Sequence, residues 1–215
     1  MGAAPSSQAV AYAPFVSTAI TSSPLTARED HVIVIEGATW SDYQRHLELR
    51  GERSVPRITF LEDRLEFMCP SRFHEQKASR IGRLVETWCQ ERGVDFEPCG
   101  SWTIEGKDVK RGCEPDECYV FGEVDEPERP DLAIVVVWTS GGILELDVYE
   151  RLGVPEVWIW KEGVLRSYAL EGGEYVEIEG SRILPGIDLR RLAGFLDHPK
   201  TRQAIADYRE ALRKG

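Results

Sequence analysis

Two aspartates stand where a strand is expected to begin, and each follows a proline. Asp116 ends the run Glu114-Pro-Asp116, and Asp131 follows Pro130 ahead of an apolar segment. Because proline cannot donate to a sheet, it marks a strand start and leaves the aspartate at the end of the sheet, where a cation can reach it. An aspartate that merely ends a loop explains either pattern equally well.

Two glutamates open expected helices on their packed side. Counting by three and four from Glu75 reaches Gly82 and further apolar positions, so its carboxylate should continue the apolar stripe and point inward. Its neighbour His74 is expected at the surface or as a cap. Glu75 either caps its own helix or binds a metal ion together with Asp116. Glu145 stands at the start of a later helix, and for it the capping role is slightly favoured over metal binding.

Other catalytic chemistries find little support in the sequence. The four histidines have no metal-ligand spacing, and the chain contains no G-x-S-x-G or Walker motif. The five cysteines form no C-x-x-C pair, and their odd number makes a poor disulfide framework. We therefore expect free thiols and a reducing, cytoplasmic location.

Hydrophobic periodicity places these residues in a mixed α/β fold. Residues 73–92 have a helical period, and 132–138 is apolar on both alternating faces, as in a strand covered on both sides. We predict an α/β architecture in which helices flank a mixed β-sheet. The other expected strands are 31–35, 57–61, 64–68, 157–160, 165–170 and 175–178, with extended segments around 102–104 and 118–121. The other expected helices are a short one that begins after Thr39 or Ser41 and ends at Gly51, one that follows the turn Ser140-Gly-Gly and ends at Leu152, and 189–196 and 202–212.

Length and charge limit the organisation and the partners. The chain has 215 residues and a formal net charge of −11. We expect a flexible tail over 1–30, one domain over 31–198 and a C-terminal helix over 199–215. No apolar run approaches the length that crosses a bilayer, so no membrane partner is expected.

An acidic chain does not coat nucleic acid through its bulk charge, so any contact with DNA must be local. The segment that contains Lys107, Lys110 and Arg111 could follow a phosphate backbone. Acidic residues are interleaved with these three, and a solvated loop is the simpler interpretation.

Several of these motifs, taken in order, resemble the Uma family. The motifs are Pro70-Ser71 with His74-Glu75, Glu114-Pro-Asp116, Pro130-Asp-Leu132 before a Val/Ile strand, and Gly153-Val-Pro-Glu-Val-Trp158. This family comprises bacterial proteins classed as restriction endonucleases within the PD-(D/E)XK nuclease superfamily. The resemblance covers roughly residues 31–196 and implies a restriction-endonuclease-like core around a divalent metal.

The resemblance assigns roles to individual positions. It implies that Glu75 is the helix glutamate and that Asp116 is the first metal aspartate. The second acid of the family falls at Val135, and its lysine falls at Glu145 or, in the alternative placement, at Val137. Two of the four positions therefore depart from the family pattern, and they are the ones nearest the chemistry.

Two functions are compatible with this pattern. The first is a metal-dependent DNA endonuclease that hydrolyses phosphodiesters with an altered site, in which Glu75 and Asp116, joined by Glu145, would hold Mg²⁺ or Mn²⁺. The second is a catalytically inactive nuclease-fold protein that acts as a binding or assembly module. The resemblance makes DNA the expected partner, and a homodimer would place two sites on the two strands.

Overall fold

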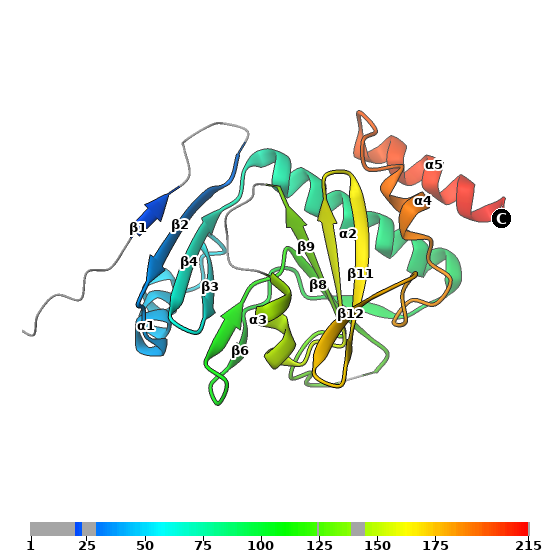
Figure 1. Ribbon diagram of the computed structural model, residues 1–215. Helices are drawn as coiled ribbons and strands as arrows, with labels where there is room; N and C mark the ends of the chain where they lie inside the picture. The colour runs from blue at the N-terminus through cyan, green and yellow to red at the C-terminus, as the bar shows by residue number, and fades with distance from the viewer. Residues whose placement is uncertain (1–19, 23–28, 124, 139–144, 215) are drawn as a thin grey trace, which may run out of the picture.

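Two β-sheets and the helices around them make up the described chain (Figure 1). The computed structural model describes residues 20–22, 29–123, 125–138 and 145–214. The helices of this part of the chain are α1 (Trp40–Arg50), α2 (Arg72–Arg92), α3 (Glu145–Leu152), α4 (Leu189–Ala193) and α5 (Thr201–Arg213).

The first sheet is antiparallel throughout its described strands. In spatial order it contains β1 (Ile20–Ser22), β2 (His31–Glu36), β4 (Arg64–Cys69), β3 (Arg57–Leu61), β7 (Arg111–Cys113) and β6 (Ile104–Gly106). The predicted hairpin of β3 and β4 is confirmed. Its alternating apolar residues, among them Ile58 and Phe60, are buried against Tyr43 of α1. Strand β1 lies within the segment expected to be a tail.

The second sheet is mixed. Its order is β12 (Glu174–Ile178), β11 (Val164–Glu171), β10 (Glu156–Lys161), β9 (Leu132–Val137), β8 (Glu117–Phe121) and β5 (Phe96–Pro98). Strand β9 is parallel to β10 and antiparallel to β8. The predicted covered strand is confirmed, because Ile134 and Val136 pack in the core beneath α2, whereas Ala133 and Val135 pack in the core beneath α3.

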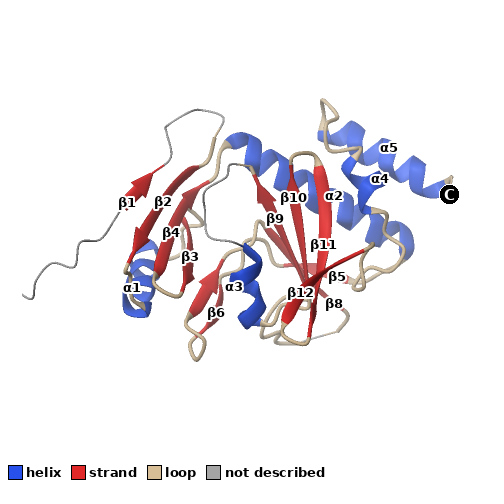
Figure 2. Cartoon of the chain, in the orientation of Figure 1, coloured by secondary structure: helices blue, strands red, loops and turns tan. Residues whose placement is uncertain are grey.

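Helix α2 runs behind the second sheet and carries the longest apolar stripe among the described helices (Figures 1 and 2). The Ser71 hydroxyl caps its start by accepting from the His74 backbone N–H at 3.2 Å, and Gly93 ends it in the left-handed conformation. Such caps satisfy backbone groups that the helix leaves without partners. The ends of α2 are therefore fixed, which positions the residues of its first turn.

The C-terminal helices pack on α2. Residues Tyr208 and Leu212 of α5 are buried in the same core as the α2 stripe. Arg80 of α2 donates to the backbone carbonyls of Leu196 and His198, at 2.7 and 2.5 Å. Arg80 therefore has a structural role. No described helix is long and apolar enough to cross a bilayer.

The predicted fold class is confirmed: helices flank a mixed sheet, consistent with a restriction-endonuclease-like core. The separate first sheet was not predicted. Three of its strands, β1, β6 and β7, have three residues each, which is too short to produce a readable alternation.

Candidate functional site

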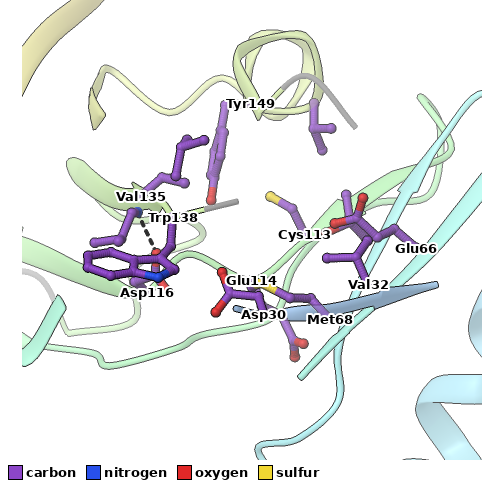
Figure 3. A pocket seen from close by; sticks show the side chains of 14 residues that line it. Asp30, Val32, Glu66, Met68, Cys113, Glu114, Asp116, Val135, Trp138 and Tyr149 are labelled. Atoms are coloured by element: carbon purple, nitrogen blue, oxygen red, sulfur yellow. Dashed lines mark hydrogen bonds between the residues drawn. The ribbon is translucent and has the colours of Figure 1, made fainter. Parts of the chain in front are cut away.

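The candidate site lies between the two sheets. A cavity of about 60 Å³ opens there, and Figure 3 shows Val135 and Trp138 on one side of it and Val32 and Glu66 on the other. Asp116, which directly precedes β8, lines the same cavity. The site therefore joins the first sheet, the mixed sheet and, through neighbouring contacts, the start of α2.

Both carboxylate oxygens of Asp116 are occupied by protein donors. Its Oδ1 accepts from His74 Nε2 at 2.6 Å and from Arg57 Nη1. Its Oδ2 accepts from the backbone N–H of Val136 at 2.6 Å, the contact that is dashed in Figure 3. The side chain is only 3% exposed. Asp116 is thus held by three donors that come from β3, α2 and β9.

Arg57 bridges the two acids that the sequence singled out. While Nη1 donates to Asp116, Nη2 donates to Glu75 Oε1 at 2.8 Å. Arg57 begins β3, and its side chain is 6% exposed. The structure therefore brings Glu75 and Asp116 together, as expected for a shared site, but a guanidinium stands between them.

The predicted orientation of the first turn of α2 was wrong. The Glu75 side chain is 50% exposed, whereas His74, expected at the surface or as a cap, is 1% exposed. At 3.6 residues per turn, His74 lies two, three and four turns before the buried residues Ile81, Val85 and Trp88. His74 is therefore at the centre of the stripe, and Glu75 is at its margin.

His74 links Asp116 to a second buried carboxylate. Its Nδ1 lies 2.8 Å from Asp30 Oδ2, and Asp30 Oδ1 accepts from the Ser71 backbone N–H at 2.7 Å. Burial alone would lower the pKa of His74, but its hydrogen bonds to Asp116 and Asp30 outweigh burial and raise the pKa to about 9. His74 is therefore an imidazolium at neutral pH that donates to both carboxylates.

The two aspartates are correspondingly ionised. Burial would raise the pKa of Asp116, but the charges of Arg57 and His74 and the hydrogen bond from Val136 lower it below its usual value. For Asp30 burial is again opposed, here mainly by the hydrogen bonds from His74 and Ser71, and its pKa is also lowered. Charges therefore alternate in sign along the cluster: Asp30 is negative, His74 positive, Asp116 negative and Arg57 positive.

Glu114 lines the cavity but is held by a separate cation. Arg50 Nη1 lies 2.5 Å from both of its oxygens, and Glu114 Oε2 also accepts from the Ile58 backbone N–H at 2.9 Å. The hydroxyl of Thr103 donates to Oε1 at 2.5 Å. With 3% of its side chain exposed, Glu114 ties α1 to the first sheet.

Glu117, the residue after Asp116, has an unusual environment. Burial, together with the negative charges of Glu86 and Asp116, raises its pKa to about 7. It lies against Gly82 of α2, where an added Cβ would be 3.2 Å from the Glu117 carboxyl carbon. The missing side chain at Gly82 therefore makes room for Glu117.

Among the described side chains, the positions that depart from the family pattern add no metal ligand to the cavity. Val135 and Val137 line it with hydrocarbon. Glu145 begins α3, but its side chain lies outside the described part of the structure. Within the described residues, no three His, Cys, Asp or Glu side chains are grouped so that they could hold a metal ion. As they stand, these residues do not fit a divalent cation.

The predicted nucleic-acid contacts lie on the β6–β7 hairpin. Lys107 and Lys110 are exposed in its turn, and Arg111 is half-buried at the start of β7. In Figure 1 this turn is the green loop below β6. The other end of β7 reaches the site, because Cys113 lines the cavity. The hairpin thus connects the candidate site to an exposed pair of lysines.

A comparison with protein families identifies the family of the chain. The sequence matches the Uma2 family, described as "Putative restriction endonuclease", over residues 40–195. The chain belongs to the Uma2 family. The suspected resemblance is confirmed, and the match includes α2, Asp116, β9 and α3. The family indicates a nuclease function with DNA as substrate. Among curated proteins, none matches the chain.

Sequence reasoning missed three members of the site. Arg57, His74 and Asp30 each contact one of the other charged groups at 2.8 Å or less. A signal was present for His74, because it lies on the same helical stripe as Ile81. No local pattern marks Arg57 or Asp30, since their partners are distant in sequence.

Proposed function

We propose that this Uma2 protein is a catalytically silent nuclease-fold module that binds DNA without hydrolysing it. The observation that carries the proposal is the state of Asp116. Both of its oxygens accept hydrogen bonds from protein groups, and the position for the second acid holds Val135. A magnesium-type ion requires carboxylate oxygens that can be directed to it.

The charge around the cavity also opposes cleavage. Four acidic side chains line it, namely Asp30, Glu66, Glu114 and Asp116, and the cations beside them, Arg50, Arg57 and His74, are each already paired with a carboxylate rather than available to a phosphate. The lysine that the family resemblance implies would offset phosphate charge, but position 145 is a glutamate. Loss of one group that stabilises developing charge commonly slows a reaction on the order of 10²–10³-fold. Two such losses would leave little activity.

The alternative is an active Mg²⁺- or Mn²⁺-dependent DNA endonuclease. It is favoured by the convergence of Glu75 and Asp116 on one guanidinium, which places a helix carboxylate beside a strand carboxylate. Such an enzyme would have to displace Arg57 and recruit Glu145 as a further ligand.

Plasmid nicking separates the two functions. We expect wild-type protein with Mg²⁺ or Mn²⁺ to nick supercoiled DNA no faster than Asp116→Ala, which controls for contaminating nucleases. Metal-dependent nicking that is lost in Asp116→Ala would instead establish the endonuclease. The double variant Val135→Glu/Glu145→Lys restores the two family residues, and we expect it to nick the plasmid faster than wild type.

DNA binding is tested separately by fluorescence anisotropy with a labelled duplex. We propose that Lys107, Lys110 and Arg111 supply the phosphate contacts. Replacing Lys107 and Lys110 with alanine should weaken binding and reduce the salt dependence by about two phosphate contacts. The matched control is Lys161→Ala/Lys200→Ala, which removes the same charge elsewhere. Equal losses of DNA affinity in both double variants, or no DNA binding by wild type, would contradict the proposal that the β6–β7 hairpin contacts phosphate.

A further inference from the structure

Two free cysteines face each other at the edge of the second sheet. The edge strand β5 runs antiparallel to β8 with Pro98 opposite Tyr119, and the next step of this register sets Cys99 opposite Cys118. The backbone N–H of Cys99 donates to the carbonyl of Cys118 at 2.8 Å, so the pairing extends to these residues. Side chains directly opposite in an antiparallel pair lie on the same face of the sheet. The two thiols are therefore neighbours although they are distant in sequence.

The spacing of this pair suits a disulfide bond. Opposite residues in an antiparallel pair have Cα atoms about 4.5–5.5 Å apart, and disulfides join residues whose Cα atoms are about 4.4–6.8 Å apart. Burial raises the pKa of both thiols, to about 12 for Cys118, and a hydrogen bond between the two thiols lowers the pKa of Cys99 and raises that of Cys118. The two sulfur atoms are thus within reach of each other before any bond forms.

The two thiols differ in their access to solvent. Cys99 follows the end of β5 and is half-buried, whereas Cys118 lies within β8 and is 0% exposed. Each thiol donates to a backbone carbonyl, Cys99 to Glu97 at 3.6 Å and Cys118 to Gly100 at 3.2 Å. Thiols are weak donors, so little is lost when their hydrogens are removed. An oxidant therefore reaches Cys99 first, and Cys118 lies behind it as the thiol that completes the bond.

We propose that Cys99 and Cys118 form a reversible disulfide by exchange with a small-molecule disulfide such as oxidised glutathione. The Cys99 sulfur loses its proton and attacks one glutathione sulfur, whose S–S bond breaks, and the first glutathione leaves and takes up a proton. The Cys118 sulfur then loses its proton and attacks the Cys99 sulfur, and the second glutathione leaves in the same way. Two cysteine thiols are oxidised, and one glutathione disulfide is reduced to two thiols. A dithiol reductant reverses the reaction.

The bond closes the chain around the candidate site. The segment between the two cysteines contains β6, β7, the exposed Lys107 and Lys110 of their hairpin, and Asp116. Oxidation therefore ties both ends of this segment to the edge of the second sheet. The inference goes beyond the proposed function and does not depend on DNA binding.

Thiol mapping of the full chain tests the inference. The protein is equilibrated with oxidised glutathione, its remaining thiols are alkylated, and its peptides are identified by mass spectrometry with and without dithiothreitol. We expect wild type to gain one reducible link, between Cys99 and Cys118, and to become lighter by two hydrogen atoms at these residues. Cys118→Ser should lose the link and leave Cys99 joined to glutathione. The matched control is Cys113→Ser, which removes another buried thiol and should retain the link, because Cys113 lies opposite Ile104 in the first sheet.

A second measurement uses wild type alone and so does not require the variants to fold. Trypsin cleaves after Lys107 and Lys110, which are exposed between the two cysteines. After brief digestion, the two fragments of oxidised protein should stay together on a non-reducing gel and separate with dithiothreitol. Free thiols at Cys99 and Cys118 after equilibration would overturn the inference. So would glutathione on Cys99 that Cys118 does not displace, or a link to Cys99 that survives in Cys118→Ser.

Discussion

Raising the pH above neutrality should weaken the fold through His74. Its two ring nitrogens contact Asp30 and Asp116, and its pKa in the folded protein is raised from the usual 6.5 to about 9. The folded state therefore holds this proton more tightly than the unfolded state. Its stabilising effect is complete below about pH 6.5, is lost progressively as the pH rises to about 9, and is absent above that value. The pKa difference corresponds to about 3 kcal/mol of unfolding free energy.

The assay is urea unfolding of wild type and His74→Gln at intervals between pH 6 and pH 10. Wild type should lose about 3 kcal/mol more than the variant across this range. Other groups also titrate there, including Glu117 with its pKa of about 7, and subtracting the variant removes their contribution. Equal pH profiles for the two proteins would refute the reasoning. So would an NMR titration that places the His74 pKa below 7.

Two further predictions concern packing and charge. Gly82→Ala should destabilise the protein by about 1–3 kcal/mol, because the new Cβ would lie 2.8 Å from the Tyr119 hydroxyl oxygen; an unchanged urea midpoint would contradict the close approach of α2 and β8. Arg50→Met should cost about 3–5 kcal/mol, since it leaves Glu114 charged and buried. The double variant Arg50→Met/Glu114→Gln should recover much of that loss in thermal unfolding, and no recovery would argue against a charge effect.

The elements that could be predicted from the sequence are those with a sustained period. Helix α2 shows a stripe over several turns, and β9 is apolar on both faces, so each was predicted within a residue or two of its observed bounds. The hairpin of β3 and β4 was equally clear. The convergence of Glu75 and Asp116 was also anticipated. Glu75 lies at the start of a helix and Asp116 at the start of a strand, and these two starts meet at one end of such a sheet.

The cations of the site could not be predicted in the same way. Arg57 and Asp116 are 59 residues apart, and Asp30 and His74 are 44 residues apart. Local periodicity says which face a residue occupies but not which distant residue faces it. The wrong orientation predicted for His74 and Glu75 shows a related limit. Both residues lie within one apolar stripe, and only the packing of α2 decides which of them lies at the centre of the stripe and is buried.

Under the proposed silent function, the charged cluster supplies the charge that a metal ion would otherwise bring to this scaffold. A buried carboxylate such as Asp116 is costly unless a positive group compensates it, and in a metal enzyme the ion supplies that charge. Here Arg57 and His74 supply it from within the chain, Arg57 at all working pH values and His74 while its imidazole is protonated. The same contacts occupy the oxygens that an ion would need. Under the proposed silent function, the contacts that stabilise Asp116 are therefore also the ones that oppose metal binding.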